Sequence, residues 1–254
     1  MRYIANSKIN LAMKNKAVGI DGCKFGWIAA CYEEGTIKIF STISELWNYY
    51  GIDYNFLIDM PMGLPSAQIP HRTCEEFARL ILPREKKSSL FPVPCREAFE
   101  ANTYPEANEM NRRVLGKGIT KQTWFIMPKI KALDELLIKN EAAKLRFKES
   151  HPEIAFQLLN NGQPLVMGKK TNGGILERLG ILQNHKPETE RIYKDALLRF
   201  KRAEVAADDI LDALCLSLMQ TKIQEAWHSG IHHTFPPQPA LDSFGIEMAI
   251  YYMP

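Results

Sequence analysis

The stretch AVGIDGCKFGWIAACYEEGTIKIF, residues 17–40, decides the fold class of this protein. Its first apolar run ends in Asp21, which is typical of a buried strand, and Gly22–Gly26 predicts a turn. Two further strands are predicted at residues 27–31 and 36–40, joined by a tight Glu-Glu-Gly turn. Three short strands connected by tight turns predict an antiparallel meander.

A fourth strand and a long insertion follow the meander. The apolar run NFLID, residues 55–59, again ends in Asp, and the prolines and glycine directly after it stop the strand. A strand pattern returns only at residues 145–150, and the intervening residues, about 66–143, have the pattern of helices and loops. Helical connections in α/β folds are much shorter than this. The segment is therefore predicted to be a helical cap inserted between two core strands.

The rest of the chain completes an α/β domain. Residues 206–223 carry the clearest helical pattern, the proline-rich stretch 236–239 predicts a stiff linker, and residues 246–252 predict a final edge strand. We therefore expect one domain over residues 16–254, preceded by a loose N-terminal extension at residues 1–15. Its mixed sheet would combine the antiparallel meander with parallel strands, flanked by helices.

The bulk composition narrows the class of protein. The chain has 254 residues, of which 46% are hydrophobic and 24% charged, and these values are ordinary for a globular protein. No window reaches the ~18 consecutive apolar residues of a membrane span, and the first fifteen residues lack the apolar core of a signal peptide. Five cysteines without CxxC spacing argue against a zinc knuckle or a disulfide framework. These features predict a cytoplasmic protein with no membrane partner.

Acidic residues recur where strands end and where the strongest helix begins. Asp21 ends the first strand, Asp59 ends the fourth, and the late helix opens with Asp208, Asp209 and Asp212. Ligands bind at the carboxyl ends of parallel strands, and residues three or four apart share a helix face, so that Asp212 can join Asp208 or Asp209. Converging carboxylates repel one another, and Mg²⁺ or Mn²⁺ relieves this best. Together the acids predict a metal site, although each one alone is equally typical of a turn or a helix start.

The distribution of basic residues is more informative than the net charge of +3. Residues 68–148 contain 16 Lys and Arg against 10 Asp and Glu, so the remainder of the chain is slightly acidic. A basic segment beside acidic strand ends suits a phosphate-bearing substrate held near metal ligands. A solvated helical surface is the alternative explanation of the same charges.

Several motifs in one order carry a family resemblance. The succession of meander, strand-end Asp, second strand-end Asp and late acidic helix resembles the ribonuclease H superfamily, and DILDAL (209–214) resembles the DxxDAL helix of RuvC-type Holliday-junction resolvases. More closely, the chain is similar to the DUF429 family, described as predicted nucleases with a ribonuclease-H-like fold. The matching motifs cover nearly everything from Val18 onward: GIDGCKFGWIAA (19–30), IDMPMGLP (58–65), RTCEEFAR (72–79), SSLFPVPCR (88–96), GKGITKQTW (116–124), HPEIAF (151–156), GKKTNGGILERL (168–179) and ADDILDAL (207–214).

The resemblance implies a set of acids that are catalytic and hold Mg²⁺ or Mn²⁺: Asp21, Asp59, Asp209 and Asp212. In RuvC-type sites the acid of the fourth strand is usually Glu, so Asp59 is one methylene shorter than that pattern. If the helix is rotated, Asp208 takes the place of Asp209 as the metal-ligand candidate. Glu149 and Glu153 flank the fifth strand and are further metal-ligand candidates, although the sequence His-Pro-Glu at 151–153 equally fits a helix cap.

Cationic and polar residues within the motifs are the candidates for substrate contact. Arg is suited to bidentate phosphate contact and Lys to a point-charge contact. The alternative for Arg178 is an ion pair with a helix acid such as Glu177. The candidates are Arg72, Arg96, Lys117, Gln122, Lys129, Lys169, Lys170 and Arg178.

Three functional classes follow from these features. The leading hypothesis is a divalent-metal-dependent nuclease that hydrolyses phosphodiester bonds. The alternative is a non-catalytic protein that binds nucleic acid or a phosphorylated ligand on the same fold, since Asp59 departs from the resolvase pattern. A phosphotransferase of the actin and sugar-kinase type generally needs two copies of the fold and Gly-rich loops, and only Gly173–Gly174 resembles such a loop. RuvC-type resolvases act as dimers, so the resemblance allows a homodimer, but the sequence identifies no dimer face.

Overall fold

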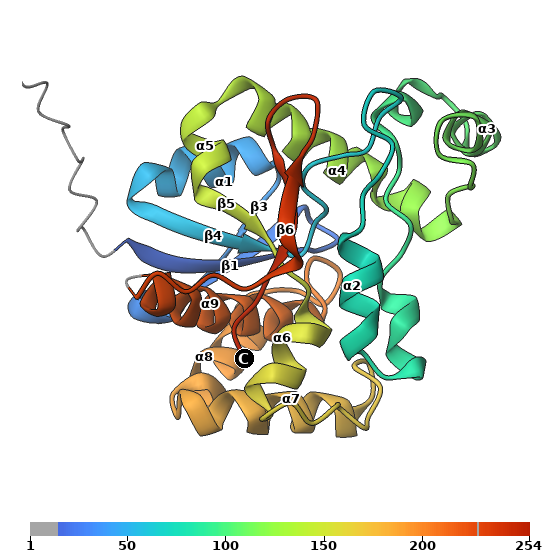
Figure 1. Cartoon of the computed structure of the whole chain (residues 1–254). Coiled ribbons are helices and arrows are strands. Elements are labelled where there is room, and N and C mark those ends of the chain that lie inside the picture. Colours follow the sequence, from blue (N-terminus) through green and yellow to red (C-terminus); the bar gives the residue numbers. More distant parts are fainter. Residues whose placement is uncertain (1–14, 228) are drawn as a thin grey trace, which may run out of the picture.

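The computed structural model describes residues 15–227 and 229–254 (Figure 1). The predicted N-terminal extension lies outside the described residues, except for Asn15. Short 3-10 helices occur at Tyr32–Glu34, Gly51–Asp53, Arg84–Ser89 and Arg96–Glu100. The strands and α-helices follow in the order β1 (Lys16–Gly22), β2 (Trp27–Cys31), β3 (Thr36–Phe40), α1 (Ile43–Tyr50), β4 (Tyr54–Ile58), α2 (Cys74–Ile81), α3 (Tyr104–Leu115), α4 (Lys121–Lys139), α5 (Glu141–Arg146), β5 (Phe147–Glu149), α6 (Pro152–Leu159), α7 (Asn172–His185), α8 (Thr189–Arg199), α9 (Ala207–Trp227), β6 (Thr234–Leu241) and β7 (Glu247–Tyr251).

Within the described residues, seven strands form one mixed sheet in the order β3-β2-β1-β4-β5-β7-β6. The pairs β1–β2 and β2–β3 are antiparallel, as the meander predicts. The pairs β1–β4, β4–β5 and β5–β7 are parallel, and β6 pairs antiparallel with β7. The predicted α/β class, with a mixed sheet flanked by helices, is confirmed, and the arrangement is compatible with a ribonuclease-H-like fold.

Two predictions about the last strands are wrong. The proline-rich stretch predicted as a linker belongs to β6, whose sequence TFPPQPAL contains three prolines. The strand predicted for the edge of the sheet is β7, which lies between β5 and β6. Proline removes a donor from the hydrogen-bond ladder and is therefore confined to edge strands and irregular positions. This explains why β6 takes the edge and why its register shifts between Phe235 and Ala240.

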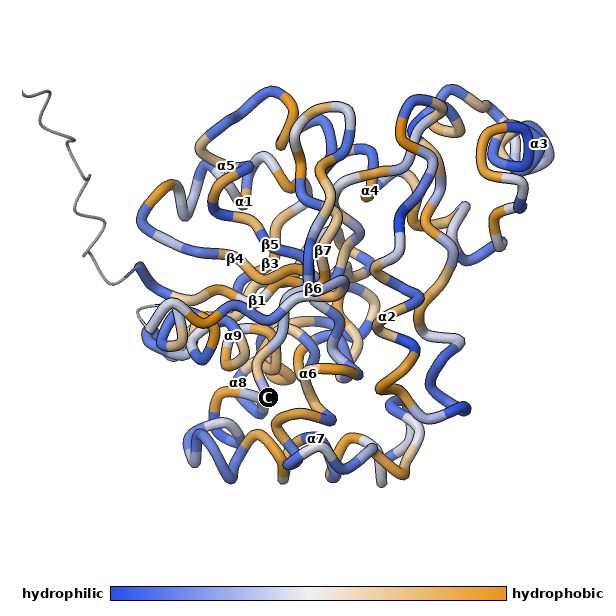
Figure 2. Tube along the Cα trace, viewed as in Figure 1, coloured by the Kyte–Doolittle hydropathy of each residue, from blue (hydrophilic) through white to orange (hydrophobic). Residues whose placement is uncertain are grey.

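Helices cover both faces of the sheet. In Figure 1, α1, α4 and α5 lie above it and α6, α7, α8 and α9 lie below it. Val18 and Ile20 of β1 pack with the upper helices. Because strand side chains alternate between faces, Gly19 and Asp21 point to the lower side, towards α9. Figure 2 shows that the strands in the interior are largely hydrophobic, whereas α3 on the outside is hydrophilic.

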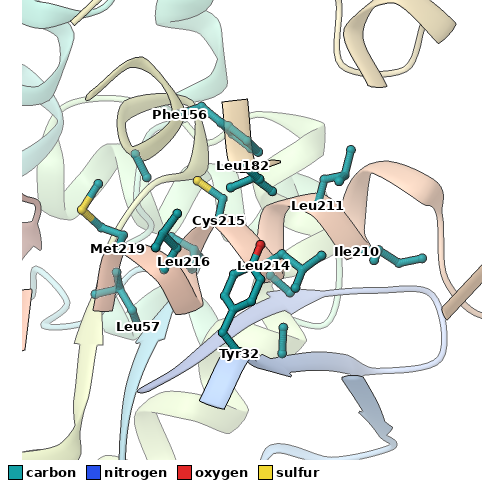
Figure 3. Close-up of a cluster of buried hydrophobic side chains, with 14 of the residues drawn as sticks. Tyr32, Leu57, Phe156, Leu182, Ile210, Leu211, Leu214, Cys215, Leu216 and Met219 are labelled. Atoms are coloured by element: carbon teal, nitrogen blue, oxygen red, sulfur yellow. The ribbon is translucent and has the colours of Figure 1, made fainter. Parts of the chain in front are cut away.

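The late helix, α9, is buried nearly all round rather than along a single stripe. It lies between the sheet and α6, α7 and α8, so that its apolar residues contact Leu57 on one side and Phe156 and Leu182 on the other (Figure 3). A Cβ on Gly19 would lie 2.1 Å from the Ala213 carbonyl oxygen, so only glycine allows this close approach. The approach brings the acidic first turns of α9 beneath the carboxyl end of β1.

The chain between β4 and β5 contains α2 to α5 and spans the predicted cap segment. In Figure 1, α2 and α3 lie to the right of the sheet, at the side where the parallel strands end, while α4 and α5 return above it. No helix of the described residues combines the length and hydropathy that a membrane crossing requires. All five cysteines are buried free thiols.

Candidate functional site

Two strand-end aspartates lie side by side on the lower face of the sheet. Ile20 and Ile58 are register partners in the parallel pair of β1 and β4, and the Asp59 amide donates to the Ile20 carbonyl over 3.0 Å. Asp21 and Asp59 each follow one of these isoleucines, so strand alternation turns both side chains towards α9. Asp21 is 8% exposed and Asp59 is only partly exposed.

Helix α9 supplies further carboxylates from below. Asp212 is 1% exposed and precedes Ala213, the residue whose carbonyl meets Gly19 of β1. Asp208 lies one turn earlier and is also buried. Asp209 instead accepts a 3.0 Å hydrogen bond from the Ala206 amide and so caps the start of α9.

One lysine from a distant loop lies among these acids. The Nζ atom of Lys169 donates to Asp212 Oδ2 over 2.9 Å and lies 3.8 Å from Asp208 Oδ2. Asp208 rather than Asp209 therefore accompanies Asp212 at this ammonium group. Asp212, Asp21 and Asp59 all raise the pKa of Lys169, against the opposing effect of its burial. We define Asp21, Asp59, Asp208 and Asp212 as the acid cluster.

The ionisation of the acid cluster reflects burial and mutual repulsion. Burial raises the pKa of Asp21 well above its ordinary value, and the charges of Asp59 and Asp212 raise it further. Burial also raises the pKa of Asp212 to about 6, although Lys169 opposes this shift. The pKa of Asp59 is raised by burial, with His151 and Lys169 acting in the opposite direction. Burial and mutual repulsion therefore make full ionisation of the cluster costly, although Lys169 lies among the carboxyl groups.

Replacing Asp21 with Asn should raise the free energy of unfolding by about 1 kcal/mol at pH 7.5. When the pKa of a carboxyl group is raised on folding, ionisation of that group destabilises the folded state. The loss of stability caused by Asp21 is therefore absent well below its ordinary pKa of 3.8, and it develops as the pH rises towards the raised pKa. The Asn oxygen can keep the 2.6 Å hydrogen bond from the Gly22 amide.

Urea unfolding followed by tryptophan fluorescence at pH 3 and pH 7.5 tests this prediction. The gain should nearly vanish at pH 3, below the ordinary pKa of 3.8. Asp195 of α8 is the matched control, because its carboxylate is 61% exposed and pairs with exposed Arg191 at 3.3 Å. An Asp21→Asn variant that is less stable than wild type at pH 7.5 would show that the Asp21 charge stabilises the fold.

The chemistry of the acid cluster fits a hard divalent cation. Carboxylate oxygens are the ligands that Mg²⁺ and Mn²⁺ prefer. Within residues 15–227 and 229–254, no three His, Cys, Asp or Glu side chains form a ready-made metal site. The Lys169 ammonium instead lies at the carboxylate of Asp212. Metal binding would therefore require side chains of the cluster to rearrange.

A histidine missed by the sequence analysis as a site residue lies beside Asp59. His151 follows β5, the parallel neighbour of β4, and with Asp59 lines a narrow cavity of about 20 Å³, roughly the space of one water. Its buried Nδ1 atom has no hydrogen-bond partner among residues 15–227 and 229–254, and its Nε2 atom lies 3.4 Å from the Ser89 carbonyl oxygen. Ligands bind where parallel strands end, and this rule predicts Asp21 and Asp59 as site residues. Because His151 also follows a parallel strand, the same rule could have identified it.

The structure does not bring Glu149 into the acid cluster. Glu149 is the register partner of Ile58, so it points to the opposite face of the sheet from Asp59. There it pairs with Arg72 at 2.6 Å and accepts a 2.7 Å hydrogen bond from the Met62 amide. Both side chains are buried, so this pair holds the turn after β4 against β5.

Glu153 lies closer to the cluster but is also paired. It contacts Arg178 at 2.5 Å and Lys86 at 3.4 Å. The Arg178 side chain is fully buried, and it pairs with Glu153 rather than with Glu177. Glu177 instead accepts hydrogen bonds from two backbone amides of the loop before α7.

Other candidates for substrate contact divide into engaged and exposed residues. Arg96 pairs with Asp134 and Asp242, each at 2.7 Å. Lys129 donates to two carbonyl groups of the β1–β2 turn, those of Cys23 at 2.6 Å and Gly26 at 2.7 Å. The candidates with exposed side chains are Lys117, Gln122 and Lys170.

A larger cavity lies next to the Asp59 cavity. It has a volume of about 280 Å³, and its lining includes His71, Arg79 and Lys117. Glu75 and Val93 line both cavities, so the two adjoin between α2 and the loop before α3. Cationic groups are thus available near one side of the acid cluster.

Comparison with known proteins gives a family but no activity. A family model described as "Protein of unknown function (DUF429)" matches residues 19–240. No curated protein and no solved structure matches the chain significantly. The matched range contains the strand-end acids, the whole segment between β4 and β5, and α9. The chain therefore belongs to the DUF429 family.

Proposed function

We propose that this protein is a divalent-metal-dependent nuclease that hydrolyses phosphodiester bonds of nucleic acid. One observation carries the proposal: Asp21, Asp59 and Asp212 lie near one another below the carboxyl ends of parallel strands, where burial and mutual repulsion make their full ionisation costly even beside Lys169. A cation site at this edge is the usual place for ligands in an open α/β sheet. Mg²⁺ or Mn²⁺, when bound, would activate a water and stabilise the leaving oxygen.

The residues of the chain have separate roles in this proposal. Asp21, Asp59 and Asp212 would hold the ion, with Asp208 as the fourth carboxylate and Asp209 kept as the cap of α9. His151 lies where it can contact a group bound beside Asp59. The 280 Å³ cavity with Arg79 and Lys117 would receive a phosphate of the strand. The proposed setting is the cytoplasm, where buried thiols stay reduced.

A second candidate function is non-catalytic binding of nucleic acid or a phosphorylated ligand. The specific observation in its favour is the 2.9 Å ion pair between Lys169 and Asp212, which occupies one oxygen of the cluster. The described residues also contain no ready-made metal site. In this case the acids would have a structural role and the basic cavity would be the functional part.

The test is cleavage of labelled DNA and RNA, as single strands, duplexes and four-way junctions, in Mg²⁺, Mn²⁺ and EDTA. We expect metal-dependent cleavage that falls at least ~100-fold in Asp21→Asn and Asp212→Asn, more than changes outside the ligand set usually cost. Asp195→Asn is the matched control, because Asp195 is exposed on α8. Unchanged cleavage in Asp212→Asn would contradict the proposed metal site. Retained binding without cleavage in either metal would support the second function.

A further inference from the structure

The cation of the acid cluster comes from a loop rather than from the core. Lys169 belongs to the segment 160–171 between α6 and α7, and 43 residues separate it from its partner Asp212. Its side chain is 39% exposed, whereas that of Asp212 is 2% exposed. A partly exposed lysine therefore reaches from the surface to a buried carboxylate of α9.

Neighbouring cationic side chains pair with groups outside the acid cluster. Lys129 donates to the carbonyl groups of Cys23 and Gly26, and Arg178 is paired with Glu153. Lys170, the next residue in the loop, is exposed. Among the cations of the described residues, Lys169 thus lies within hydrogen-bond distance of Asp212.

A divalent ion and Lys169 compete for the same oxygens. Mg²⁺ or Mn²⁺ at the cluster would coordinate carboxylate oxygens of Asp212, to which the ammonium group now donates. The ammonium group repels an approaching ion, and this repulsion is weakly screened in the interior. An ion that coordinates Oδ2 of Asp212 therefore takes the place of the ammonium group.

Lys169 can leave without opening the fold. The backbone beside it is fixed, because a Cβ on Gly174 would lie 2.0 Å from the Gly168 carbonyl oxygen, so the loop packs tightly on α7. The side chain, by contrast, has four rotatable carbon–carbon bonds and an exposed route to solvent. Its displacement requires only a rotamer change.

We propose that Lys169 is a built-in substitute for the metal ion: it neutralises the acid cluster in the metal-free protein and is displaced when a divalent cation binds. This inference rests on the metal site of the proposed function. In the absence of metal, the ammonium group stabilises the folded protein by pairing with a buried carboxylate. It also weakens metal affinity, because every binding event must first break the Lys169–Asp212 ion pair.

The test is Mn²⁺ binding to the full chain, measured from the electron paramagnetic resonance signal of free Mn²⁺ at pH 8. Lys169→Met should bind Mn²⁺ at least ~10-fold more tightly than wild type. It should also melt at a lower temperature without metal and show a larger Mn²⁺-induced rise in Tm. Lys169→Arg keeps the charge, and Lys170→Met removes the exposed neighbouring charge, so both should stay near the wild-type affinity.

Lys169→Gln, which retains an amide donor for Asp212, replaces the Met variant if that variant does not fold. Equal or weaker Mn²⁺ binding by Lys169→Met and Lys169→Gln overturns the inference and leaves the proposed nuclease standing. Absence of Mn²⁺ binding in every variant overturns both. Tighter binding by Lys169→Met that is lost on adding Asp212→Asn supports the inference, even if no nucleic acid is cleaved.

Discussion

Replacing Arg72 with Met should lower the free energy of unfolding by about 3–5 kcal/mol, because breaking a buried ion pair leaves a charge without its partner. The Arg72 side chain is 2% exposed. It donates to both oxygens of Glu149 at 2.6 and 2.8 Å and to Glu75 at 2.9 Å. It also donates to the carbonyl groups of Met62 and Gly63, in the turn directly after Asp59. Urea unfolding measures the loss.

The loss in the Arg72→Met variant should increase with pH. Burial raises the pKa of Glu149 to about 7 even beside Arg72, whose charge lowers it. Without the guanidinium group the folded state binds the Glu149 proton still more tightly, so ionisation costs stability as the pH rises. Arg113→Met is the control, because both members of its 3.1 Å pair with Glu109 are 74% exposed and such pairs contribute less than about 1 kcal/mol. Equal losses in the two variants would contradict the prediction.

Replacing Arg178 with Met should also cost about 3–5 kcal/mol, for the same physical reason. Its side chain is 0% exposed and pairs with Glu153 at 2.5 Å. The guanidinium carbon lies 5.3 Å from the centre of the Phe156 ring, and one nitrogen lies 3.4 Å from the Gly174 carbonyl oxygen. Among the described residues, the single substitution would leave Glu153 with the more distant Lys86, at 3.4 Å. Thermal and urea unfolding measure the loss.

The double variant Arg178→Met/Glu153→Met distinguishes an ion-pair effect from a packing effect. Exchanging both members of a buried pair for apolar residues of similar volume is often nearly neutral. The double variant should therefore recover most of the stability that Arg178→Met loses. A double variant at least as unstable as Arg178→Met alone would show that packing around Phe156, rather than the unpaired charge, sets the cost.

The two arginines illustrate how far local sequence patterns reach. Both lie in family motifs and are candidates for substrate contact in the sequence, since Arg suits phosphate, with an ion pair to a helix acid as the alternative for Arg178. In the folded chain each is buried against a carboxylate, Glu149 or Glu153, that was itself a metal-ligand candidate. Sequence alone cannot distinguish a phosphate-binding arginine from one paired internally, because the partner comes from another part of the chain: Glu149 is 77 residues from Arg72.

The α/β class, the meander and the strand-end positions of Asp21 and Asp59 can be predicted from the amino-acid sequence. These features depend on local patterns, namely apolar runs, turn residues and the two-residue alternation of strands, which the chain carries within about ten residues. The prolines of β6 misled this reasoning, because their tolerance depends on an edge position that only the assembled sheet defines.

Which acids lie near one another, and which cation pairs with them, depends on how the chain packs in three dimensions. Asp212 reaches Asp21 because Gly19 lets α9 approach β1, and Glu149 is excluded because its register with Ile58 turns it to the other face. Lys169 enters the cluster from a loop whose position no local pattern specifies. The physical reason is the same in each case: charges interact through space, and segments far apart in sequence become neighbours only when the core packs.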